Sequence, residues 1–259
     1  MHGNLTRSYE RKNMTSEQIA AEVGEKLAVV GPGFYFKPET LARGKELGLD
    51  GFRFYVAGRG GVLGDVNGAI VASAFGYFNP AMLTGRWDTA LEKIAAREAG
   101  REYVACCQQQ GRLQLSDVDG LTDFCAAAEH VLANTEAGAL ALFAGLNAEP
   151  LADDLPAKAM QLGASLREYR GSAHLVALLA NGLTPQRAHF MKRPDDYATF
   201  GWSDDPAPVT AVETAAKAAA EEMTNRICGT AFASLDADGV AAIQTGSTAI
   251  AAAINAGLA

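Results

Sequence analysis

The stretch LREYRGSAHLVALLANGL, residues 166–183, brings together the residue types best suited to binding an anion or moving a proton. On a helix, Arg167, then Arg170 or Gly171, then His174 fall on one face. A guanidinium binds a carboxylate or phosphate through two parallel hydrogen bonds, and an imidazole exchanges protons near neutral pH. Glycine inside a helix costs about 1 kcal/mol relative to alanine, so Gly171 indicates close approach of another group.

Two interpretations of this face stay open at the level of sequence. In the first, Arg170 and His174 line a pocket for an anionic or polar ligand, together with Arg59. Aromatic side chains would form the rest of that pocket, namely Tyr55, Phe78 and Trp202. In the second, the arginine pairs with an acidic residue of a neighbouring helix, and the histidine bonds to a carbonyl group.

Three functions are compatible with these residues. The first is a small-molecule-binding protein, and the second is an enzyme in which His174 acts as acid or base while Arg170 stabilises negative charge. The third is a transcriptional regulator. No nucleophile can be identified, so the catalytic residues and any cofactor stay unknown. The segment GRGG at residues 58–61 follows no strand and predicts a helix end with a turn rather than a phosphate loop.

Composition limits the partners that we expect. The chain has 259 residues, 49% of them hydrophobic, and a net charge of −8. This acidity argues against a nucleic-acid partner. No apolar run approaches the roughly 18 residues of a membrane span, so no membrane partner is expected. Four histidines and four cysteines without zinc-type spacing predict no metal site, and the cysteines are typical of reduced thiols in the cytoplasm.

Helical periodicity recurs along the chain and predicts an all-α, multi-helix globular bundle. The small residues of NGAIVASAFGYF, residues 67–78, recur at helical spacing, which favours a helix over a strand. Residues 1–13 are expected to form a flexible tail, with either Met1 or Met14 as the start. Residues 14–259 then form one helical domain, with possible subdomains 14–115 and 116–259. Two alanine-rich helices near the C-terminus suit close packing, within the chain or in a homodimer.

Several motifs of the chain resemble those of a helix-turn-helix domain family that is common in actinobacteria and has no assigned reaction. They are a Phe-x-Pro-Glu segment, a Gly-Phe…Tyr…Arg…Leu-Gly segment, a Phe-x-Pro segment, and an Arg-Gly-x-x-His helix before Gly-Trp. The matching positions are Phe36, Pro38, Glu39, Gly51, Phe52, Tyr55, Arg59, Leu63, Gly64, Phe78, Pro80, Trp87, Arg170, Gly171, His174, Gly201 and Trp202. The resemblance covers residues 15–203 and resumes weakly at residues 213–232.

The chain departs from the family pattern after Gly201 and Trp202. Such relatives carry a winged helix at this point, which takes roughly 60 residues with basic positions for phosphates. Here residues 203–224 contain one lysine and no arginine. We therefore expect the winged helix to be absent or truncated, which strengthens the expectation that no nucleic acid is bound.

Overall fold

The computed structural model describes residues 14–257, and these residues form helices and loops without any strand. The predicted all-α fold is confirmed. No β-wing occurs within the described range, and residues 203–210 form a loop that leads into the next helix. The expected flexible tail, residues 1–13, lies outside the described residues.

Twelve α-helices make up most of this part of the chain. The first six are α2 (Ser16–Leu27), α3 (Pro38–Glu46), α4 (Gly51–Gly61), α5 (Gly68–Phe75), α6 (Pro80–Leu91) and α7 (Ala96–Gln114). The others are α8 (Leu121–Ala133), α9 (Ala141–Asn147), α10 (Leu155–Ala180), α11 (Pro185–Lys192), α12 (Ala211–Phe232) and α13 (Ala237–Ala256). Short 3-10 helices occupy η1 (Ala28–Val30), η2 (Pro194–Asp196) and η3 (Ala198–Phe200).

Side-chain caps and prolines define where these helices begin. The hydroxyl of Thr15 and the side chain of Gln18 form a reciprocal capping box at the start of α2. Asp154 accepts a hydrogen bond from the backbone of Ala157 at the start of α10. Pro38 occupies the first position of α3, where its missing N–H costs nothing. Residues at or within three positions of each start therefore determine where these helices begin.

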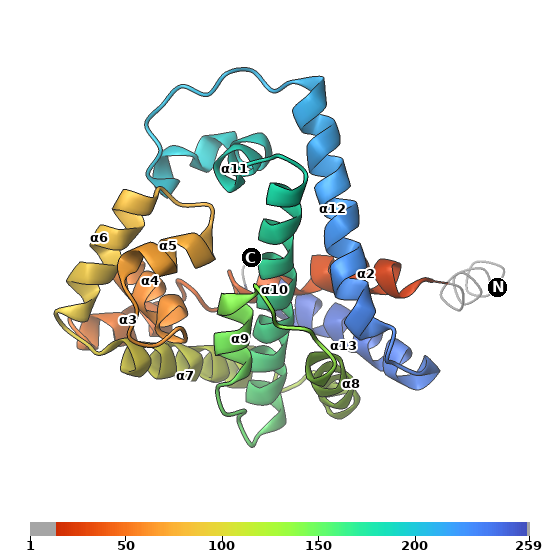
Figure 1. Ribbon diagram of the computed structural model, residues 1–259. Helices are drawn as coiled ribbons and strands as arrows, with labels where there is room; N and C mark the ends of the chain where they lie inside the picture. The colour runs from red at the N-terminus through yellow and green to blue at the C-terminus, as the bar shows by residue number, and fades with distance from the viewer. Residues whose placement is uncertain (1–13, 258–259) are drawn as a thin grey trace.

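Helix α10 runs through the centre of the molecule (Figure 1) and provides the surface that the other elements cover. It packs against α2, α7, α8, α9 and α12. One continuous cluster of buried apolar side chains extends from Ile19 in α2 to Ile254 in α13. A helix buried on so many sides accepts polar side chains only where other groups satisfy them, so its polar residues mark the places to search for a site.

Glycines bring α4 against α7. A Cβ at Gly61 would lie 2.2 Å from the carbonyl oxygen of Ala96, and one at Gly58 would lie 2.3 Å from the ring of Tyr103. The GRGG segment therefore forms the last turn of α4 and allows a close helix crossing. The prediction of a helix end and a turn is confirmed, because α4 ends at Gly61 and a turn follows at residues 62–63. No described helix is long and apolar enough to span a membrane.

Candidate functional site

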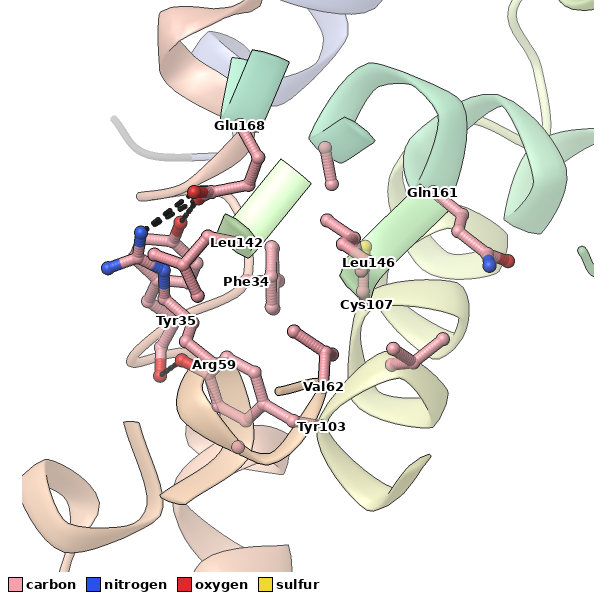
Figure 2. Close-up of a pocket in the computed structure, with 13 residues that line it drawn as sticks. Phe34, Tyr35, Arg59, Val62, Tyr103, Cys107, Leu142, Leu146, Gln161 and Glu168 are labelled. Atoms are coloured by element: carbon pink, nitrogen blue, oxygen red, sulfur yellow. Dashed lines mark hydrogen bonds and ion pairs between the residues drawn. The ribbon is translucent and has the colours of Figure 1, made fainter. Parts of the chain in front are cut away.

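A buried ion pair joins α4 to α10 at the centre of the molecule. Nη2 of Arg59 donates to both carboxylate oxygens of Glu168, at 2.9 Å each. Nη1 of Arg167 donates to the same carboxylate at 3.0 Å, and the hydroxyl of Tyr35 donates to it at 3.3 Å. Figure 2 shows the guanidinium of Arg59 and the hydroxyl of Tyr35 directed at this one carboxylate.

Aromatic rings surround the guanidinium of Arg59. Its central carbon lies 4.4 Å from the ring centroid of Phe75, 5.2 Å from that of Tyr55 and 5.6 Å from that of Tyr35. Burial alone would raise the pKa of Glu168, but the charges of Arg59 and Arg167 outweigh it and hold that pKa below its ordinary value. The carboxylate is therefore ionised at neutral pH.

A narrow cavity of about 30 Å³ opens beside this ion pair. Figure 2 shows its walls, which are mostly apolar and come from α4, α7, α9, α10 and the segment before α3. Phe34, Tyr103, Leu142 and Leu146 are among the side chains that line it. Such a volume holds one or two water molecules and no organic ligand.

Arg170 and His174 belong to a second polar cluster, between α10 and α12. Arg170 donates to Asn225 at 2.7 Å and to Glu221 at 2.9 Å. Its side chain passes over Gly24 of α2, where an added Cβ would lie 2.4 Å from the arginine Cδ. The Arg-Gly-x-x-His motif thus holds α12 and α2 against the central helix.

The tautomer of His174 follows from its partner. The hydroxyl of Thr224 donates its only proton to the carbonyl of Ala220 at 2.7 Å. It must then accept from Nδ1 of His174, which lies 2.9 Å away, so the neutral ring carries its proton on Nδ1. Nε2 faces Glu221 at 3.7 Å. Burial lowers the pKa of His174 below its ordinary value of 6.5, although the charge of Glu221 acts in the opposite direction.

The structure divides the six predicted ligand-binding residues into separate groups. Tyr55 and Phe78 lie in the aromatic cluster around Arg59, with their ring centroids 6.0 Å apart. Trp202 lies beside the α5–α6 turn, where its indole N–H donates to the carbonyl of Tyr77 at 2.9 Å. Arg170 and His174 form the α10–α12 cluster described above. Ligand binding by these residues stays a prediction.

Sequence reasoning missed Glu168, the residue on which the central cluster is built. One signal points to it: the buried stripe of α10 includes Gln161, Ala164, Glu168 and Ser172 at helical spacing. A carboxylate on such a stripe requires a cationic partner. The partner, Arg59, lies 109 positions away in the chain, and no local pattern identifies it.

Helices α5 and α6 form a short helix–turn–helix unit in which α6 packs against α4, and the turn between them contacts Leu175 of α10 (Figure 1). The turn begins with Gly76, at a φ of 74°, and ends with Asn79, whose side chain accepts from the backbone of Ala81 and Met82. A Cβ at Gly68 would lie 2.7 Å from Thr84, so the two helices pack closely. A glycine-containing turn of this length is typical of helix-turn-helix motifs.

The described residues contain no group of three or more metal-binding side chains. Comparison with curated proteins and with solved structures finds no match to the chain. A helix-turn-helix family model matches residues 19–259. This match contradicts the expectation that nucleic acid is no partner, since helix-turn-helix units are nucleic-acid-binding motifs. That expectation rested on charge averaged over the whole chain and on residues 203–224 alone. Because the match covers nearly the whole chain, the protein belongs to this helix-turn-helix family.

Proposed function

We propose that the protein is a transcriptional regulator that binds duplex DNA through α5 and α6, with α6 entering the major groove. The α5–turn–α6 geometry is the observation that carries this proposal. Helix α6 buries only Leu83, Trp87 and Ala90, and its opposite face lies at the outer edge of the molecule (Figure 1). A helix in this position can enter a groove without rearrangement of the fold.

The outer face of α6 and its continuation carry residues suited to a DNA contact. Arg86 and Lys93 are exposed. The ion pair of Arg86 with Asp50 is long, with 3.8 Å between nitrogen and oxygen. Gly85 is also exposed, and a Cβ there would meet no protein atom within 4 Å. An exposed glycine in mid-helix weakens the helix, and close approach of a DNA backbone would account for it.

Charge is distributed unevenly along the chain and favours this face. Residues 38–114, which hold α3 to α7, contain nine Lys and Arg against eight Asp and Glu, a net charge of +1. Residues 115–259 contain eight Lys and Arg against eighteen Asp and Glu, a net charge of −10. The acidic part would repel DNA, so α3 to α7 would be the part that approaches the phosphates.

A second helix–turn–helix pair, α10 and α11, is less suited to this role. Arg187 of α11 bonds to both oxygens of Glu213 and to the carbonyls of Ala207 and Pro208. Gln186 bonds to the hydroxyl of Tyr197. These side chains are held by several short hydrogen bonds within the protein. Arg86 on the outer face of α6 has only a 3.8 Å ion pair with Asp50 and a 5.7 Å contact with the ring of Phe52, so it is easier to release toward a base.

A regulator of this kind would act in the cytoplasm, where the four buried, unpaired cysteines would stay reduced. It would also act as a homodimer, because helix-turn-helix proteins commonly read two half-sites. Two exposed apolar side chains, Leu179 near the end of α10 and Val212 near the start of α12, are candidates for such a contact.

The proposal is tested by capture of a random-sequence duplex library on the full chain at about 50 mM salt, followed by sequencing. We expect enrichment of a defined sequence, and its loss when Arg86→Ala and Lys93→Ala are combined. Arg226→Ala is the matched control, because Arg226 is exposed on α12 in the acidic part of the chain. Absence of enrichment with the wild-type chain would overturn the proposal, as would equal enrichment by the double variant.

A further inference from the structure

The central ion cluster carries an excess of positive charge. Two guanidinium groups, those of Arg59 and Arg167, share the carboxylate of Glu168, and neither pairs with a second acidic side chain among the described residues. Arg59 is largely buried, while 31% of the Arg167 side chain is exposed. One uncompensated cation therefore lies at the edge of the core, where charge of the opposite sign would stabilise it.

Arg167 also has hydrogen-bond donors to spare. Its Nη1 donates to Glu168 and, at 2.7 Å, to the hydroxyl of Tyr35. Its Nη2 and Nε donate to no side chain or carbonyl of the described residues. A guanidinium offers five N–H donors, and two parallel ones match the two oxygens of a carboxylate.

Gly171, one turn further along α10, leaves open space beside this arginine. A Cβ built there meets no atom within 4 Å, although the residue is half-buried. Gly24 and Gly31 differ, because an added Cβ would touch the side chains of Arg170 and Arg167. Packing within the protein thus explains those two glycines and leaves Gly171 without an explanation.

Apolar and aromatic groups border the same part of α10. The ring of Tyr35 lies 5.2 Å from the central carbon of Arg167. Leu175, one turn beyond Gly171, contacts Gly76 of the α5–α6 turn. Tyr77, next in that turn, lies close enough to Glu221, Arg167 and Glu168 for their charges to affect its phenol.

We propose that the surface of α10 at Gly171 binds a small organic monocarboxylate. Its carboxylate would pair with the free donors of Arg167, and its apolar body would lie over Gly171 against Tyr77 and Leu175. The charges around the site favour a monoanion over a dianion. Glu168 and Glu221 would both repel the second negative charge of a phosphate monoester. The site is independent of the proposed DNA contact, because it uses no residue of the outer face of α6.

The test uses the full chain without DNA. Thermal unfolding is followed with acetate, isovalerate, benzoate and phenylacetate, with inorganic phosphate as the dianion comparison, and responses are confirmed by calorimetric titration. We expect at least one carboxylate with an apolar body to raise the Tm by about 5–10 °C at a hundredfold excess over its Kd. Phosphate is expected to have no effect. A panel without any carboxylate response would overturn the proposal.

Two variants locate the site. Gly171→Ala fills the open space, so the Tm without ligand should rise by about 2–4 °C while carboxylate affinity falls at least tenfold. Arg167→Gln should also weaken the carboxylate at least tenfold, whereas the matched control Arg226→Gln should bind it as the wild type does. Unchanged affinity in Gly171→Ala, with its Tm raised, would show that the ligand does not lie on this surface.

Discussion

Replacement of Glu168 by glutamine tests the role of the central ion cluster in the fold. The substitution preserves side-chain volume but removes the only carboxylate within residues 14–257 that pairs with Arg59 and Arg167. It also turns an amide N–H₂ toward a guanidinium donor. Removing one partner of a buried ion pair costs about 3–5 kcal/mol, because the other charge stays buried without compensation. For a chain of this size we expect the Tm to fall by about 6–20 °C.

An exposed ion pair provides the comparison. Asp154 pairs with Arg112 at 2.7 Å, and both side chains are about half exposed. Asp154→Asn retains a good N-cap for α10 and removes the charge, so it should cost less than about 1 kcal/mol. Both variants are measured by urea unfolding at pH 7, with the slope m as a check on two-state behaviour. A loss in Glu168→Gln no larger than that in Asp154→Asn would refute the reasoning.

Three further predictions concern pH, packing and assembly. Burial lowers the pKa of His174 below 6.5, so the unfolded chain takes up the proton first as pH falls, and stability is lost from about pH 6.5 downward. In urea titrations, the His174→Asn variant should lose less unfolding free energy between pH 7 and pH 5 than the wild type. Equal losses in the two proteins would contradict the attribution of this pH dependence to His174. Gly61→Ala should destabilise the fold by about 1–3 kcal/mol, because its Cβ would overlap the carbonyl of Ala96. An unchanged urea midpoint would contradict this close crossing. Val212→Glu should convert a dimer to a monomer in light scattering, and a dimer in both proteins would exclude this surface.

Local patterns predicted much of the fold. Helix starts at Thr15, Pro38 and Asp154 follow from capping chemistry within a few residues of the chain. The helical spacing of small residues at 67–78 correctly favoured a helix, α5, over a strand. The GRGG segment correctly predicted the end of α4 and the turn after it, but the close packing of its glycines against α7 does not follow from any local pattern.

The candidate sites were harder to predict because their partners are distant in the sequence. Both interpretations of the Arg-Gly-x-x-His helix agreed on the importance of Arg170, but only the fold shows that Glu221 and Asn225 occupy its donors. The neighbouring Arg167, by contrast, uses only Nη1 as a side-chain donor in the part of the chain that the structure describes. Charge was also averaged over the chain, which concealed the difference between α3 to α7 and the acidic remainder.

The most direct measurement for the central claim is the salt dependence of DNA binding by the full chain. Binding to the enriched duplex is measured by fluorescence anisotropy at several salt concentrations. The wild-type chain should bind with a negative slope of log K against log salt concentration, which reports the number of phosphate contacts. Combining Arg86→Ala with Lys93→Ala should make that slope less steep by about 0.9 for each phosphate contact removed, while Arg226→Ala should leave it unchanged. Equal slopes and affinities for the wild type and the double variant would contradict the assignment of α6 as the DNA-binding helix.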